Sequence, residues 1–322
     1  MKDIFIMIKR TFILLLFISL YTSLFAGSFR HLNVREGLSS RQVYQICKDS
    51  TGFIWAYTHM GVDRYDGNEI RHYKLNETID SKDHILSFTV MEIDKEGNLW
   101  IALRNGRIYR YDKLKDCFEL QVDLSQSISF PVLNGIEFEE NGGLWLSTST
   151  GVYYWSRTDK VLSPAGLIGE WTNCIIKSAE NTFFVGTNTE VYKMEKSTTT
   201  CQLSKEKVDI PVEARIEALF LYGTKLYVGT FSNSAFVIDL VTKQVKSLNS
   251  FIPGIPVRVF AHDGDHSILI GADGAGVFRI DAANETLTEH YITDEDDERS
   301  LTGNTVSDIC VDEYGGIWVS TC

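Results

Sequence analysis

The chain has 322 residues, of which 44% are hydrophobic, 23% charged and 12% aromatic, a composition typical of a folded protein with a sizeable core. Its formal net charge is -12 and no cluster of Lys and Arg occurs, which excludes a nucleic-acid surface because phosphates are bound by basic residues. The cysteines show no CxxC and no closely paired spacing, which argues against a disulfide framework or a zinc site: Cys47, Cys117, Cys174, Cys201, Cys310 and Cys322. We expect buried strand thiols, no metal and no cofactor.

The first 28 residues have the pattern of a targeting signal. Lys2, Lys9 and Arg10 precede a nearly continuous apolar stretch over 11–26, which is shorter than the roughly 20 residues of a membrane span. We predict a signal peptide over 1–28, with an uncleaved N-terminal anchor as the alternative. Either reading places the rest of the chain outside the cytoplasm.

After this segment the chain repeats itself. Trp55, Trp100 and Trp145 stand 45 residues apart, and glycines and aspartates around them keep the same interval. Weaker copies follow, with another large residue in the tryptophan position. The seven positions, with a mean period near 44, are Trp55, Trp100, Trp145, Phe184, Tyr227, Leu269 and Trp318.

Each copy is typical of four short β-strands. Apolar runs alternate with polar residues, and a D-x-x-G turn comes before the tryptophan, where Asp can accept turn amides and Gly supplies a positive φ. The large residue after the turn can bury against the next copy. We predict that these repeat residues are structural: Asp49, Gly52, Trp55, Gly61, Asp94, Gly97, Trp100, Gly106, Trp145, Gly151, Asp312 and Trp318.

Four strands in about 44 residues are the blade of a β-propeller. We therefore predict an all-β, seven-bladed β-propeller of four-stranded antiparallel blades over 29–322, preceded by the signal peptide or anchor. Residues 29–32 resemble the outermost strand at 70–73, and we expect them to complete the last blade. The seventh blade is incomplete, and we expect a parent chain that continues. Blade cores are predicted near 43–76, 90–120, 134–160, 174–200, 215–248, 257–291 and 306–322.

The combination of Gly37-Leu-Ser-Ser40, V-x-x-I-x-x-D-x-x-G-x-I-W from Val43, and G-V-D-R-Y-D-G from Gly61 resembles the two-component regulator propeller repeat. The resemblance covers about 29–322 and is strongest in units 1, 2, 3 and 7. It implies the periplasmic sensor region of a hybrid two-component sensor histidine kinase anchored in the inner membrane. Further propeller and kinase domains of the parent chain would be partners, with a homodimer left open. Members of the family commonly sense oligosaccharides, so a glycan-derived small molecule is the implied ligand.

No catalytic motif stands out. The repeating aspartates are better interpreted as turn caps than as glycosidase carboxylates, and no G-x-S-x-G or H-E-x-x-H occurs. The Gly-rich stretch 271–276 lies between two predicted strands and not between strand and helix, which argues against a nucleotide site. The acidic run 294–298 is interpreted as a solvated loop.

Ligand-binding residues are expected in the turns between the second and third strands of each unit, because such turns vary freely on a rigid scaffold. The candidates are His59, Arg64, Arg104 and Asn105, and for each of them the favoured alternative is an ordinary surface-loop residue. Three functions follow in order of preference. The first is an extracytoplasmic ligand-sensing propeller without enzymatic activity of its own. The others are a stand-alone secreted propeller that binds protein or glycan, and a propeller lyase or hydrolase.

Overall fold

The computed structural model describes residues 29–73, 90–103, 106–124, 132–197, 202–211, 213–264 and 266–321. The predicted signal peptide at 1–28 lies outside these residues. The chain divides into two compact units, one comprising residues 1–31 with 294–300 and the other 32–293 with 301–322. No helix in the described part of the chain is long and apolar enough to span a membrane.

The first unit is small. In its described part, the Phe29 amide donates to the Arg299 carbonyl at 2.8 Å, and the His31 ring nitrogen Nε2 lies 2.7 Å from the Ser300 carbonyl. Residues 29–32 form no strand, so the prediction that they are an outermost strand is wrong. The physical reason is that an outermost strand needs a third strand beside it, and the last sheet has two strands in the described residues.

All the strands that the structure describes belong to the second unit. Its first three sheets are four-stranded and antiparallel. They are blade 1, with β1 (Val43–Lys48), β2 (Ile54–Thr58), β3 (Gly61–Tyr65) and β4 (Ile70–Tyr73); blade 2, with β5 (Val90–Ile93), β6 (Leu99–Ala102), β7 (Arg107–Asp112) and β8 (Cys117–Asp123); and blade 3, with β9 (Leu133–Phe138), β10 (Leu144–Thr148), β11 (Gly151–Ser156) and β12 (Val161–Gly166).

Three more four-stranded sheets and one two-stranded sheet follow. They are blade 4, with β13 (Thr172–Ala179), β14 (Thr182–Thr187), β15 (Val191–Lys196) and β16 (Leu203–Val208); blade 5, with β17 (Ile216–Tyr222), β18 (Lys225–Thr230), β19 (Ala235–Asp239) and β20 (Val245–Ser247); blade 6, with β21 (Val257–Asp263), β22 (Ser267–Ala272), β23 (Gly276–Asp281) and β24 (Leu287–Tyr291); and blade 7, with β25 (Val306–Val311) and β26 (Ile317–Thr321).

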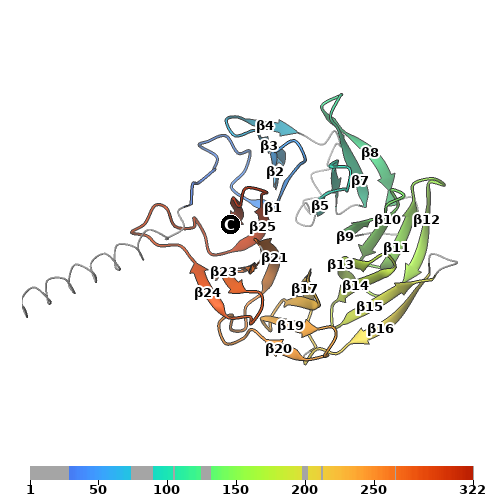
Figure 1. The fold of residues 1–322 in the computed structure, drawn as a ribbon. Helices are drawn as coiled ribbons and strands as arrows, with labels where there is room; N and C mark the ends of the chain where they lie inside the picture. Colours follow the sequence, from blue (N-terminus) through green and yellow to red (C-terminus); the bar gives the residue numbers. More distant parts are fainter. Residues whose placement is uncertain are drawn as a thin grey trace, which may run out of the picture. The chain divides into compact units, whose positions relative to one another are not determined.

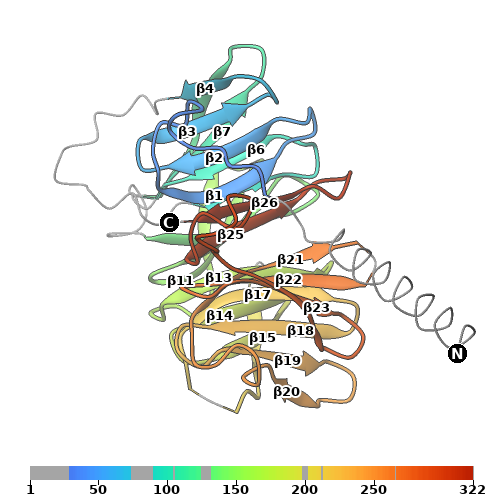
Figure 2. The same ribbon diagram turned by 90° about the vertical axis from the view of Figure 1, so that its left-hand side faces the viewer.

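The blades follow one another around a common axis, with the first strand of each blade innermost (Figure 1). Figure 2 shows β25 and β26 between β1 of blade 1 and β21 of blade 6, and the same neighbours are in contact. The prediction of an all-β propeller with an incomplete seventh blade is confirmed. The described residues form six four-stranded blades and a two-stranded seventh.

Burial explains why the second strand of a blade is a continuous apolar run. A blade is covered on both faces by its neighbours, so every residue of β2 and of β10 is buried. The outermost strands are exposed to solvent. In β16 the exposed residues are Lys, Ser and Glu, and charged side chains on an edge strand discourage pairing with other chains. The core is therefore a series of clusters between adjacent blades. In one of them, Trp55 of blade 1 packs against Tyr111 and Phe118 of blade 2, with ring centroids 4.8 and 6.0 Å apart.

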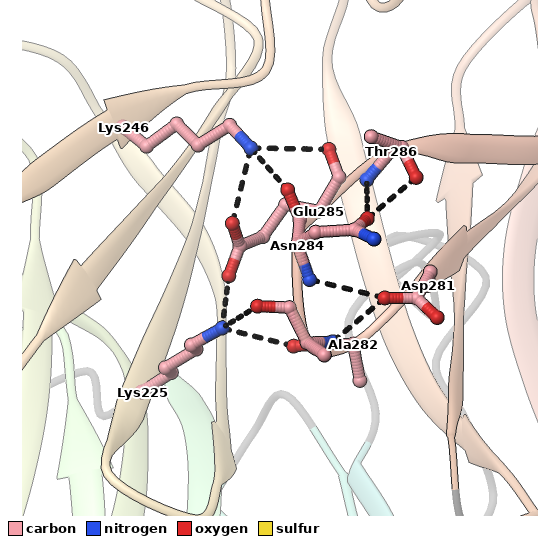
Figure 3. A network of polar contacts seen from close by, with 8 residues as sticks. Lys225, Lys246, Asp281, Ala282, Asn284, Glu285 and Thr286 are labelled. Atoms are coloured by element: carbon pink, nitrogen blue, oxygen red, sulfur yellow. Dashed lines mark hydrogen bonds and ion pairs between the residues drawn. The ribbon is translucent and has the colours of Figure 1, made fainter.

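Outer turns tie one blade to the preceding one. Glu285, in the turn between β23 and β24, forms ion pairs with Lys225 and Lys246 of blade 5 (Figure 3). Lys225 also donates to the carbonyls of Ala282 and Ala283 at 3.0 and 2.8 Å, so the whole turn is held against blade 5. Asp116 has the same place in blade 2 and accepts from Tyr73 of blade 1 at 2.7 Å. Glu285 and Asp116 both have a positive φ, as do Lys160 and Lys243 in the corresponding turns of blades 3 and 5.

We expect Glu285→Gln to lower the free energy of unfolding by about 1–3 kcal/mol, because two ammonium groups lose a charged, hydrogen-bonded partner. Chemical denaturation followed by circular dichroism measures the change. The matched control is Glu119→Gln, since Glu119 pairs with Lys115 on an exposed surface, where such pairs contribute at most about 0.5 kcal/mol. Equal shifts for the two variants would show that the turn adds nothing to blade packing.

Candidate functional site

The repeating aspartates and tryptophans form a local lock. In blade 1, Asp49 accepts the amides of Thr51 and Phe53 through Oδ1, and Trp55 Nε1 through Oδ2 at 2.9 Å. Asp94 accepts from Trp100 Nε1 at 2.7 Å, and Asp312 from Trp318 Nε1 at 3.3 Å. One carboxylate therefore caps the turn and fixes the buried indole. These carboxylates have the structural role that the repeat predicts, since each accepts both from its turn and from its indole.

Sequence reasoning missed one member of this series. Glu139 accepts from Trp145 Nε1 at 2.9 Å and forms an ion pair with Lys196 of blade 4 at 2.6 Å. The signal was present, because each of these carboxylates stands six residues before its tryptophan. The D-x-x-G pattern does not include Glu139, since blade 3 has Glu in place of Asp.

The four ligand candidates separate in the structure. His59 is exposed in the turn between β2 and β3, as expected. Arg64 is not in that turn: it lies near the end of β3, where its guanidinium donates to Tyr111 of blade 2 at 3.0 Å and stacks 5.7 Å from the Trp55 ring. Its interpretation as a turn residue is wrong, because the residue packs between two blades. Arg104 and Asn105 lie outside the described residues.

A different set of residues occupies the end of the propeller that carries these turns. In six innermost strands the register with the second strand shifts by one residue near the start, which is a β-bulge. The extra residue stands ten or eleven positions before the tryptophan position of its unit. We call these residues the bulge ring: Tyr44, Asn134, Asn173, Glu217, Arg258 and Ser307.

Side chains of the bulge ring reach the next blade. Asn134 donates to the Thr172 carbonyl of blade 4 at 2.6 Å, and Ser307 donates to the Val43 carbonyl of blade 1 at 2.7 Å. The ring combines phenol, amide, carboxylate, guanidinium and hydroxyl groups at one end of the strands. Bulges often lie beside binding sites because they redirect a side chain. Such a mixture of donors and acceptors suits a polar ligand, which makes the bulge ring the candidate binding site.

Acceptor side chains also satisfy the open edges of the innermost strands. Gln45 accepts the Met91 amide at 2.7 Å, Glu137 accepts the Lys177 amide at 2.9 Å, and Asp308 accepts the Ile46 amide at 2.9 Å. Each acceptor belongs to one blade and each donor to the next. These bonds hold neighbouring innermost strands where no β-ladder joins them.

Three carboxyl groups on the innermost strands have raised pKa values. Burial raises the pKa of Asp308 to about 7 against the amides of Ile46 and Ile309, and burial raises the pKa of Glu137. Glu92 keeps some exposed surface. Its pKa is nevertheless raised, mainly because the surrounding protein desolvates the carboxylate and then because of the charges of Glu137 and Asp308. The described residues contain no group of three or more His, Cys, Asp or Glu arranged to hold a metal ion.

The raised pKa of Asp308 has a consequence for stability. Between about pH 4 and pH 7 the folded protein binds more protons at this group than the unfolded chain, so stability should fall as the pH rises through this window. In Asp308→Asn the amide oxygen can still accept from Ile46, but no proton is exchanged. We expect denaturation midpoints measured at several pH values to vary less in the variant. Identical pH profiles for the two proteins would contradict the assignment.

Cys47 and Cys310 occupy the same position in adjacent blades, as the repeat indicates. Both thiols are free, and burial raises the pKa of each. Cys47 packs into the cluster between blades 1 and 2. Because equivalent positions point in the same direction around a propeller, Cys310 faces blade 1, and the two thiols lie on opposite sides of β1. This arrangement explains why Cys47 and Cys310 form no disulfide although their strands are neighbours.

Residues 300–322 match the family model described as two component regulator propeller. This part of the chain is therefore similar to a two component regulator propeller repeat. The match falls on blade 7, whose Asp312–Trp318 lock has the same six-residue spacing as the locks of blades 1 and 2. No curated protein matches the chain.

Solved structures are similar to the repeat-built chain in fold. The extracellular domain of BT4673 from B. thetaiotaomicron, described as a hybrid two component system, has a TM-score of 0.75 and 22% identity over 92% of this chain and 39% of that chain. The corresponding domain of BT3049 from the same organism has a TM-score of 0.73 and 19% identity, covering 91% and 40%. Virginiamycin B lyase from Staphylococcus aureus has a TM-score of 0.69 and 13% identity, covering 90% and 95%. The chain spans about two fifths of the length of the two B. thetaiotaomicron chains.

Proposed function

We propose that this propeller is the extracytoplasmic ligand-sensing part of a hybrid two-component sensor. The observation that carries the proposal is the two component regulator propeller repeat at residues 300–322. Fold similarity to two extracellular domains described as parts of hybrid two component systems supports it. The predicted signal peptide or anchor at 1–28 agrees with a location outside the cytoplasm.

The bulge ring is the proposed place of ligand binding. Its side chains belong to different blades and already bridge pairs of blades, as Asn134 and Ser307 do. A ligand that binds two blades at once would favour one arrangement of the propeller over another, and differential affinity for two arrangements is what transmits a signal. Amide, hydroxyl and charged groups suit an oligosaccharide, which is the ligand class we propose.

One alternative has a specific observation in its favour. This chain covers 95% of virginiamycin B lyase, whose whole fold is therefore matched by one propeller. At 13% identity the likeness concerns the fold, and the Asp49, Asp94, Glu139 and Asp312 carboxylates are occupied by turn amides or indoles. A propeller enzyme would turn over a glycan or peptide and lose activity on substitution of one carboxylate.

The decisive experiment sequences the DNA downstream of codon 322 and then measures the signalling response of the full protein. We expect the reading frame to continue into a transmembrane helix and a histidine kinase. In that case, deletion of residues 29–322 from the full protein should abolish the transcriptional response to the oligosaccharide that induces it. A natural stop codon after Cys322 in intact genomes would favour a stand-alone secreted propeller and contradict the proposal.

A further inference from the structure

Beside two residues of the bulge ring, an exposed aromatic side chain lies next to cationic groups. Arg215 precedes β17, and Glu217 and Arg258 are the bulge residues of blades 5 and 6. Phe231 and Asp273 lie in the turns after β18 and β22. We call these five residues the Arg–Phe cluster.

The two arginines of the Arg–Phe cluster are held differently. Arg258 donates to Glu217 at 2.5 Å and to Asp273 at 2.8 Å, so both of its terminal nitrogens have a carboxylate partner. Arg215 contacts Glu217 through Nε alone, at 2.7 Å, and without the alignment of a hydrogen bond. Its two terminal nitrogens have no partner among the residues that the structure describes. The Glu217 side chain is 8% exposed and the Arg215 side chain 41%. A buried carboxylate thus anchors a guanidinium whose outer edge faces solvent.

Phe231 supplies an apolar surface beside this guanidinium. The guanidinium carbons of Arg215 and Arg258 lie 5.4 and 5.6 Å from the centre of its ring, within the range of cation–π contacts. The residue nevertheless keeps 44% of its surface exposed, although it stands in a turn fixed by the hydrogen bond from its own amide to the Arg215 carbonyl. Two cationic groups therefore lie beside a large apolar side chain that remains accessible.

The formal charges of the Arg–Phe cluster cancel, since two arginines face two carboxylates. A small inorganic anion would therefore gain little binding free energy from such a neutral surface. A ligand gains more if it brings an anionic group to the paired nitrogens of Arg215, where a carboxylate or sulfate can be bound by two parallel hydrogen bonds. It gains further if it covers Phe231 with an apolar ring face.

We propose that the Arg–Phe cluster binds an acidic sugar, with its carboxylate or sulfate on Arg215 and the C–H face of its ring against Phe231. This inference rests on the proposed function and specifies the class of oligosaccharide. A carboxylate and a sulfate both present oxygens that two parallel N–H donors can bind. Binding experiments with both groups therefore have to distinguish a carboxylated sugar from a sulfated one.

Calorimetric titration of the propeller tests the proposal with three matched probes. They are a glucuronate-containing disaccharide, the same disaccharide with its carboxyl reduced to the alcohol, and a neutral disaccharide carrying one sulfate. We expect the reduced probe to bind at least ~10-fold more weakly than the glucuronate probe, since a hydrogen-bonded charged contact contributes about 1.5–3 kcal/mol. Tighter binding of one anionic probe shows which of the two groups, carboxylate or sulfate, the Arg–Phe cluster prefers.

Arg215→Met should remove this preference, and Arg215→Lys should restore part of it, because Lys keeps the charge but lacks the paired donors. Phe231→Ala should weaken all three probes alike. Arg157→Met, an exposed arginine in the turn between β11 and β12, is the control and should change nothing. Denaturation midpoints confirm that each variant is folded.

The inference and the proposed function fail separately. Equal binding of the glucuronate and reduced probes, unaffected by Arg215→Met, would overturn the acidic-sugar site and leave the sensor function intact. Binding of none of the three probes by the wild type would also overturn the site. The sensor function is tested independently by the reading frame and by the response of the full protein.

Discussion

Trp55→Ala should lower the free energy of unfolding by about 3–5 kcal/mol, the usual cost of removing a buried aromatic side chain. Trp55 is fully buried between Tyr73 of its own blade and Tyr111 and Phe118 of blade 2. The substitution opens a cavity between blades and also removes the indole donor of Asp49, leaving a buried carboxylate oxygen without its partner. Guanidinium denaturation followed by far-ultraviolet circular dichroism measures the loss.

Two variants separate these contributions. Trp55→Phe keeps most of the packing and loses the hydrogen bond, so about 1–3 kcal/mol of the loss should remain. Trp171→Ala is the control, because Trp171 exposes 38% of its surface in the connection between blades 3 and 4. We expect it to cost less than about 1 kcal/mol. If Trp55→Ala and Trp171→Ala shift the midpoint equally, the indole does not hold the blades together.

Gly276→Ala, at the first residue of β23, should be more damaging than a glycine substitution in the turn that precedes it. Gly276 has a φ of 75°, and a Cβ there would overlap the carbonyl oxygen of Tyr291 on β24. The overlap is with backbone of the outer strand, so relief requires the sheet to shift. We expect a loss of at least ~2 kcal/mol beyond the roughly 1–2 kcal/mol that an alanine pays for a left-handed conformation.

Gly274→Ala, in the turn just before β23, is the matched control. Its φ is 87°, but no heavy atom lies within 4 Å of the position of a Cβ. The variant should therefore lose about 1–2 kcal/mol from backbone strain alone. Denaturation midpoints of the two variants, measured under one set of conditions, should differ clearly. Similar midpoints would show that β24 moves freely and that Gly276 is needed for its φ alone.

Most of the repeat lock could be predicted from the sequence, because its parts are close together in the chain. Asp49 and Trp55 are six residues apart, and one turn brings the carboxylate to the amides and to the indole. Glu139 has the same six-residue spacing to its tryptophan, but a pattern that requires aspartate at this position does not include it. The strand pattern and the large residue at each repeat were sufficient to predict a propeller.

The candidate site was harder to predict, since it depends on how strands pair. Arg64 was assigned to a turn, yet its surroundings come from Tyr111 of the next blade, 47 residues further along. The bulge ring has a regular spacing, but a bulge is a mismatch between two strands and is visible only when their register is known.

By itself, the amino-acid sequence determined the number of units, the strand order within each unit and the aspartates that cap turns in units 1, 2 and 7. These features arise from interactions within about ten residues, which the repeat displays directly. The tertiary structure alone decided which side chains bridge neighbouring blades, because contacts such as Asp308 with Ile46, Glu285 with Lys225 and Arg258 with Glu217 join residues 41 or more positions apart. Only the closed succession of sheets brings those partners within hydrogen-bonding distance.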